Sequence, residues 1–306
     1  MPTPLNYATE YSRALAMAFP YQLYFGALYT TPNNGRYRWV NSKTIEIPSI
    51  TTTGRVNSDR DTIAFAQRNY ENAWETKTLT NERKWSTLVH PMDIDQTNMV
   101  TTITNITQAF NEYQKFPEMD AYTISKIYAD WSADEDYFGV THAADTTDIT
   151  PASVLGIFDD LMLKMDNALV PVSGRLLYVT HEVKKMINNA EKVSRSFNVQ
   201  SGDNEIDRIV NRLDEVQVIG VPARLMKTAY DFSQGWDVDA NADQINMMLV
   251  HPAAVITPVS YEFARLDSPS AMSEGKFVYY EESHEDVFIL NKKSDAIQFN
   301  VTPATP

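Results

Sequence analysis

With 306 residues, the chain is long enough for two domains, or for one domain with a large appendage. It has no cysteine, which excludes disulfides, thiolate nucleophiles and cysteine-ligated zinc, and its 10 glycines argue against nucleotide-cradling loops. A net charge of -14 repels phosphate backbones at long range, so a sequence-specific nucleic-acid binder is not expected.

Residues 1–35 read as an N-terminal arm, because their apolar side chains follow no sustained period and prolines interrupt any helix. The segment has no basic region followed by an apolar stretch, so no export signal is expected, and no apolar run in the chain reaches the length of a membrane helix. The arm either folds back on its own domain or lies on a neighbouring subunit, and both readings stay open.

A long two-stranded ribbon is predicted next, from Arg36 to Val89. Residues 44–47 alternate at period two, and a return limb is expected over residues 74–79 and 84–89. The polar stretch between the limbs is predicted to form a charged tip. Because two strands alone are marginally stable in water, the ribbon needs a surface to lie on, either its own body or another chain.

A helix is predicted from about Asp95 or Thr97, either of which can cap its start. Apolar residues then recur at helical spacing and form one stripe: Met99, Val100, Ile103, Ile106, Phe110 and Tyr113. Pro117 is expected to stop this helix, because proline lacks the backbone donor and clashes with the preceding turn. A second helix should follow from Glu118.

An α/β unit is expected after the acidic segment 132–148. Thr150 and Thr180 are predicted helix caps, residues 191–203 a loop and 206–213 a short helix. Strands are predicted at 175–179, 216–219, 223–227 and 245–250, and in the tail at 276–280, 286–290 and 296–301.

No catalytic, cofactor or metal site is expected. His181 and Glu182 begin like a zinc-protease helix, but lysines stand where the second histidine is needed. Asp93 and Asp95 could act as an acid–base pair, and a hydrolase that uses them is the remote alternative. Negative charge at a helix start explains both residues more simply.

Four short stretches, in order, resemble the major capsid proteins of tailed bacteriophages, which have the Hong Kong 97-type fold. They are residues 44–48 followed by Gly54, residues 81–97, residues 116–126 and residues 221–228. The resemblance implies an α+β fold with an N-terminal arm at 1–35, an extended β-ribbon loop at 36–88, a peripheral domain with a spine helix at 89–148, an axial α/β domain at 149–260, and return strands of the peripheral domain at 261–306. The spine helix itself would be residues 95–116.

The function implied by this resemblance is a non-enzymatic shell. Copies would form hexamers and pentamers of an icosahedral capsid around double-stranded DNA, without sequence-specific binding, in a virion assembled in the bacterial host cytoplasm. Because the arm begins almost at once, the resemblance implies either a separate scaffolding protein or a chain that is already processed. Portal and decoration proteins are further partners of such a shell. An encapsulin-like compartment that houses enzymes is the alternative. Because no lysine lies between Lys43 and Lys77, a lysine crosslink near the ribbon tip is not expected.

The candidates for contacts between subunits lie mainly on the ribbon, which has no core of its own. They are Trp39, Arg55, Arg60, Asp61, Trp74 and Arg83. Charges of both signs at the tip of the ribbon would set the alignment with a partner and the choice of partner, and would add little stability. A solvated loop without a partner could have the same charged sequence. The 16 tyrosines, 13 phenylalanines and 5 tryptophans of the chain suit large contact surfaces.

Overall fold

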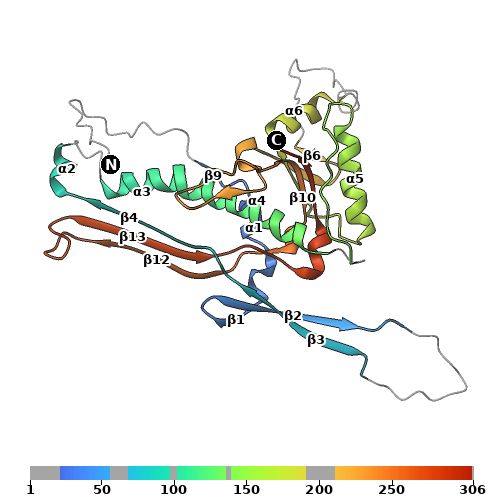
Figure 1. The fold of residues 1–306 in the computed structure, drawn as a ribbon, viewed down its shortest axis with the longest axis horizontal. Helices are drawn as coiled ribbons and strands as arrows, with labels where there is room; N and C mark the ends of the chain where they lie inside the picture. The colour runs from blue at the N-terminus through green and yellow to red at the C-terminus, as the bar shows by residue number, and fades with distance from the viewer. Residues whose placement is uncertain (1–20, 56–67, 97–101, 136–138, 191–210, 305–306) are drawn as a thin grey trace, which may run out of the picture.

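The structure, a computed structural model, describes residues 21–55, 68–96, 102–135, 139–190 and 211–304. A long helix runs along the molecule, with a three-stranded sheet under one half and a five-stranded sheet against the other (Figure 1). A separate ribbon of strands projects from the body. No helix within the described ranges is long and apolar enough to cross a membrane.

The long helix continues through the proline that was predicted to stop it. Helix α3 (Ile103–Phe110), a π-helical turn (Asn111–Lys115) and helix α4 (Phe116–Ala133) follow one another without a break. The prediction of a stop at Pro117 was therefore wrong. In the π turn the N–H of Phe116 bonds to the carbonyl of Asn111, five residues back, which widens the helix just before the proline. The ring is accommodated there, where a regular turn would clash with it.

The start of this helix also differs from the prediction. The hydroxyl of Thr102 caps α3 by accepting a hydrogen bond from the N–H of Asn105, at 3.4 Å. Asp95 lies instead in a separate short helix, α2 (Pro91–Gln96), and Thr97 lies outside the described residues. An apolar stripe predicts the face of a helix more firmly than its first residue, because several polar residues near the start can serve as a cap.

The five-stranded sheet confirms the α/β unit expected after residue 150. Its strand order is β15-β10-β5-β7-β6, in which only the neighbours β5 and β7 run parallel. The strands are β5 (Leu176–Thr180), β6 (Arg212–Leu213), β7 (Val216–Val221), β10 (Gln244–Val250) and β15 (Ile297–Thr302). Helices α5 (Val154–Asn167) and α6 (His181–Asn189) cover one face and α4 the other. Burial on both faces explains the unbroken apolar run of β5.

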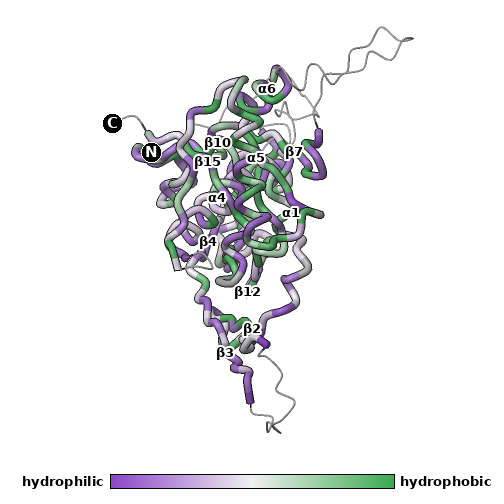
Figure 2. Tube along the Cα trace, turned by 90° about the vertical axis from the view of Figure 1, so that its right-hand side faces the viewer, coloured by the Kyte–Doolittle hydropathy of each residue, from purple (hydrophilic) through white to green (hydrophobic). Residues whose placement is uncertain are grey.

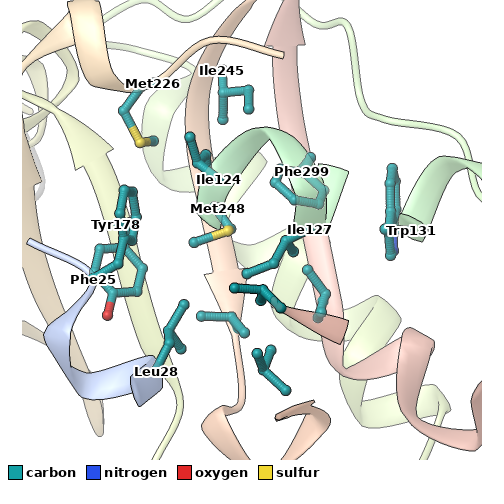
Figure 3. Packing of buried hydrophobic residues seen from close by; sticks show 14 of the residues in the cluster. Phe25, Leu28, Ile124, Ile127, Trp131, Tyr178, Met226, Ile245, Met248 and Phe299 are labelled. Atoms are coloured by element: carbon teal, nitrogen blue, oxygen red, sulfur yellow. The ribbon is translucent and has the colours of Figure 1, made fainter. Parts of the chain in front are cut away.

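The main core lies between α4 and this sheet (Figure 3). Ile124, Ile127 and Trp131 from the helix meet Met248 and Phe299 from the strands, and all five side chains are buried. The short helix α1 (Gly26–Tyr29) adds further apolar side chains to the same cluster. The core therefore joins the N-terminal part of the chain to its last strand.

The described part of the N-terminal arm, from residue 21 onward, folds back on its own chain. Phe25 and Leu28 are fully buried in the core. The carboxylate of Asp120 on α4 accepts hydrogen bonds from the hydroxyl of Tyr21 at 2.6 Å and from the N–H groups of Tyr24 and Phe25 at 3.0 and 3.1 Å. The arm was expected either to fold back on its own domain or to lie on a neighbouring subunit. From residue 21 onward it folds back on its own chain, and residues 1–20 lie outside the described residues.

The three-stranded sheet takes part of the chain that was predicted to belong to the ribbon. Its order is β12-β13-β4, with β12 (Val259–Asp267), β13 (Phe277–Glu285) and β4 (Glu82–Val89), all antiparallel. Assigning residues 84–89 to the return limb was wrong, because the side chain of Trp85 stacks on Phe110 of the long helix at a ring distance of 3.9 Å. Strand β12 was missed altogether.

The ribbon itself is confirmed in a shorter form. Strands β2 (Thr44–Thr52) and β3 (Tyr70–Thr78) pair antiparallel, and β1 (Arg38–Asn41) folds back along the first part of β2. Figure 2 shows this ribbon leaving the lower end of the body. The remaining elements are short: β8 (Tyr230–Asp231) with β9 (Asp237–Val238), β11 (Val255–Ile256) with β14 (Phe288–Ile289), and 3-10 turns at Pro32–Gly35, Ala223–Leu225, Pro252–Ala254 and Asn291–Ala296.

Several predictions about the second half of the chain were wrong. The expected strand over 223–227 begins as a 3-10 turn, since Pro222 offers no donor and its carbonyl accepts from Leu225 at 2.9 Å. The last strand, β15, joins the five-stranded sheet rather than returning to the β12–β13 sheet, because Ile297, Phe299 and Val301 complete the main core. The loop predicted over 191–203 and most of the helix predicted over 206–213 lie outside the described residues. The described end of that helix was predicted wrongly, because Arg212–Leu213 form strand β6. The division into domains stays a prediction.

Candidate assembly surfaces

The root of the ribbon is fixed to the body of the same chain. Ile45 on β2 and Leu79 just after β3 are 0% and 2% exposed, and both pack against Ile256 and Phe288 of the β11–β14 pair. Beyond this root the strands pair in continuous register, from Thr44 opposite Thr78 to Thr52 opposite Tyr70. The ribbon is therefore anchored at one end and projects at the other (Figure 1).

A buried carboxylate fixes the direction in which the ribbon leaves the body. Asp286 is 2% exposed and accepts hydrogen bonds from the N–H of Thr80 at 2.8 Å and from the hydroxyl of Tyr122 at 2.7 Å. Thr80 follows β3 and Tyr122 lies on α4, so one side chain joins the ribbon root to the long helix. Burial, reinforced by the neighbouring carboxylate, raises the pKa of the Tyr122 hydroxyl, which stays protonated as a donor.

One face of the projecting part carries exposed apolar side chains. Strand pairing places Pro48 opposite Trp74 and Thr52 opposite Tyr70, and Ile50 lies between them on the same face. The exposed fractions are 68% for Ile50, 56% for Tyr70 and 43% for Trp74. We call Pro48, Ile50, Tyr70 and Trp74 the ribbon face. Asn72 pairs with Ile50 and lies on the same face, so the apolar side chains surround one polar residue. Exposed apolar side chains gathered in this way make the ribbon face a candidate interaction surface.

The ribbon face is held in a defined shape by a cation. The guanidinium of Arg38 on β1 lies 3.9 Å from the ring centroid of Trp74 and donates to the carboxylate of Glu46 at 2.7 Å. A cation over a tryptophan face attracts the ring, and the ion pair orients the cation. The indole of Trp74 is therefore held in one position in the single chain.

Trp39 and Trp74, two predicted contact residues, point to opposite faces of the ribbon. Trp39 pairs with Ile45, whereas Trp74 pairs with Pro48, three residues further along β2. Since side chains alternate along a strand, this odd offset separates the two indoles. Trp39 is 40% exposed and makes an edge contact with Tyr37.

The predicted residues of the ribbon tip are only partly described. Arg55 is exposed and is the last residue before the gap in the described chain. Arg60 and Asp61 lie outside the described residues. Their role as contacts between subunits stays a prediction.

Arg83 belongs to β4 and bonds within its own chain. Its guanidinium donates to the carboxylate of Glu118 on α4 at 2.6 Å and to the carbonyls of Phe232 and Gly235 at 2.6 and 3.2 Å. It therefore ties the three-stranded sheet to the long helix and to the β8–β9 hairpin. A contact of Arg83 with a neighbouring subunit also stays a prediction.

Solved structures match the chain over nearly its whole length. A chain in the asymmetric unit of the mature capsid of bacteriophage PhiM1 is 12% identical, with a TM-score of 0.68, over 98% of this chain and 93% of that one. One in the head of Helicobacter pylori bacteriophage KHP40 is 9% identical, with a TM-score of 0.65, over 97% and 96%. One in the capsid of cyanophage P-SCSP1u is 10% identical, with a TM-score of 0.64, over 98% and 94%. The chain has the fold of phage capsid proteins.

This capsid fold confirms the α+β class of the Hong Kong 97 type that the sequence resemblance implied. No family model and no curated protein sequence matches the chain. Identities of 9 to 12% show that the fold is retained through the placement of its helices and strands, with few residues in common. The order and spacing of the helices and strands therefore indicated the fold, although few residues are shared with the solved structures.

The ribbon face was only partly found from the sequence. Trp74 was identified, but Ile50, Tyr70 and Pro48 were not, because the register that brings them together is fixed by the pairing of β2 with β3. The alternation of Pro48 and Ile50 with polar residues was the available signal. Among the described residues no group of histidine and acidic side chains is arranged to hold a metal ion. Asp93 and Asp95, the remote catalytic candidates, lie on the short helix α2.

Proposed function

We propose that the chain is a structural major capsid protein. Its copies self-assemble into hexamers and pentamers that form an icosahedral shell around double-stranded DNA, within a virion assembled in the bacterial host cytoplasm. The observation that carries the proposal is a rooted ribbon that projects from the body and exposes an apolar face. The match to chains in phage capsids and heads supports it.

The ribbon of one copy lies, in this proposal, on the surface of a neighbouring copy. A single contact of this size is modest in free energy, but every subunit both gives and receives it, so a closed shell accumulates many such contacts. The net charge of -14 is compatible with an enclosed nucleic acid that the shell surrounds without reading its sequence. Scaffolding, portal and decoration proteins would be separate chains.

The proposal is tested by expressing the full chain and examining it by light scattering and electron microscopy. Closed particles are expected from the natural sequence. Tyr70→Lys places a charge in the ribbon face and should abolish particles while the subunit stays folded. Thr51→Lys is the matched control, because it adds the same charge to the opposite face of the ribbon. A Tyr70→Lys protein that forms normal particles contradicts the proposal. Co-purified DNA distinguishes a capsid from an encapsulin-like compartment, which would retain an enzyme.

A further inference from the structure

The end of helix α5 carries a leucine that the fold itself does not favour. Leu169 has a φ of 58°, the left-handed conformation in which glycine is usual after a helix. Its N–H and that of Val170 bond to the carbonyls of Asp166 and Met165, at 3.0 and 3.1 Å, which closes the helix end. The leucine side chain is 89% exposed. Both the backbone and the side chain of Leu169 are therefore in unfavourable states in the isolated chain.

Leu169 stands at the rim of a hollow in the surface. The hollow lies between the end of α5 and the segments 140–143, 251–254 and 293–298. Its apolar lining is formed by Val140, Ala143, Leu169, Val170, Pro171 and Ala254. Val140 is itself 61% exposed. An apolar side chain of a partner would therefore find matching surface on several sides.

The charged groups that line this hollow are mainly cationic. Lys164 and Lys293 contribute two ammonium groups, and Asp295 contributes a carboxylate. Lys293 donates to the carbonyl of Ala253 at 3.0 Å, and burial lowers its pKa, with a smaller effect from Arg36. On a chain of net charge -14, such a surface selects a partner that carries negative charge beside an apolar group.

The turn between β12 and β13 carries such a pair of groups. Met272 is 96% exposed, and the side chain of Glu274, two residues later, is 81% exposed. Hydrogen bonds between Ser270 and Ser273, including N–H of Ser270 to the hydroxyl of Ser273 at 3.0 Å, hold the turn in shape. Glu274 pairs with Lys276 at 3.2 Å, but an ion pair this exposed is weak and readily exchanged.

We propose that this turn of one copy inserts Met272 into the hollow beside Leu169 of a neighbouring copy, with Glu274 facing Lys164. The turn lies at one end of the molecule and α5 towards the other, so the two sites of one chain do not meet (Figure 1). A contact between two different surfaces of identical chains repeats from copy to copy, as a shell requires. Methionine suits the apolar part because its flexible side chain fills irregular gaps.

This inference rests on the proposed self-assembly, and a charge exchange tests it separately. Lys164→Glu and Glu274→Lys, each alone, bring like charges together and should raise the critical concentration for particle formation by about fivefold or more. The double variant restores opposite charges and should return close to the natural value. Lys185→Glu on α6 is the matched control and should assemble normally.

The outcomes separate the two proposals. If the natural chain forms no particles, the proposed function fails. If it does, and either single variant assembles at the natural concentration, or the double variant is no better than the single ones, the contact proposed here is wrong and the function stands.

Leu169→Gly is a second, independent test of the proposed contact. Glycine relieves the left-handed strain, so the subunit should unfold at a higher denaturant concentration, while assembly should become weaker because the apolar rim is lost. A Leu169→Gly protein that assembles at the natural critical concentration overturns the inference.

Discussion

Ile50→Ser tests the ribbon face in quantitative terms. Ile50 is 68% exposed in the single chain, and full burial of an isoleucine side chain is worth about 1.5–3 kcal/mol. Covering the exposed fraction on a neighbour therefore contributes about 1–2 kcal/mol per contact, which serine cannot replace. Because each subunit inserts one ribbon, the critical concentration for assembly should rise by about 5- to 30-fold.

The assay is light scattering over a concentration series, with electron microscopy to verify that the scattering comes from closed particles. Ala73→Ser is the matched control, since it places serine on the opposite face of the same ribbon. Unfolding of the dissociated subunit should be unchanged in both variants, because both positions are exposed. A critical concentration for Ile50→Ser within about twofold of the natural value would refute burial of this face, since it corresponds to less than about 0.5 kcal/mol.

Three further predictions concern the subunit alone. Asp286→Ala leaves the partly buried donors of Thr80 and Tyr122 without their buried acceptor, so urea unfolding should show a loss of about 2 kcal/mol, and a loss below about 0.5 kcal/mol would contradict the role of this carboxylate. Thr180→Ala removes the cap of α6 and should lower stability by about 1 kcal/mol, which an unchanged unfolding midpoint would exclude. Burial raises the pKa of Glu285, so its ionisation opposes folding and its penalty grows as pH rises from the ordinary glutamate range through the raised pKa. Glu285→Gln should therefore stabilise the subunit at neutral pH and lose this advantage near pH ~4, and a gain that is equal at both pH values would contradict it.

Most of the fold could be predicted from the sequence, because the local residue patterns and the order of the elements agree with the observed helices and strands. The apolar period around Ile103 and Phe110 predicted the long helix, and the apolar run at 175–179 predicted a buried strand, which is observed as β5 (Leu176–Thr180). The cap at Thr180 was also found, and its hydroxyl accepts from the N–H of Val183 at 3.3 Å. The cap predicted at Thr150 was wrong, because α5 begins at Val154 with Ser153 at its N-cap, and the hydroxyl of Thr150 accepts from Ser153 in the turn before the helix, at 3.2 Å. These signals depend on residues close together in the chain, so they can be recognised without knowledge of the tertiary structure.

The wrong predictions concern features that the local sequence pattern does not determine. Pro117 is a helix breaker in isolation, yet the π turn before it admits the ring and the helix carries on to Ala133. Strand β4 leaves the ribbon because Trp85 gains a stacked partner in Phe110. Strand β12 was missed because eight of its nine residues are exposed, so its sequence gives no burial signal. The partners of the two strands decide their places, and a single sequence does not show which strands will pair.

Hydrogen exchange of the backbone amides of β2 and β3, measured on the full chain before and after assembly, tests the central claim most directly. The account predicts that these amides exchange fast in the dissociated subunit, because the ribbon beyond its root has no cover, and slowly in the particle. A chain that stays a monomer at high concentration, with β2 and β3 already protected, would contradict it.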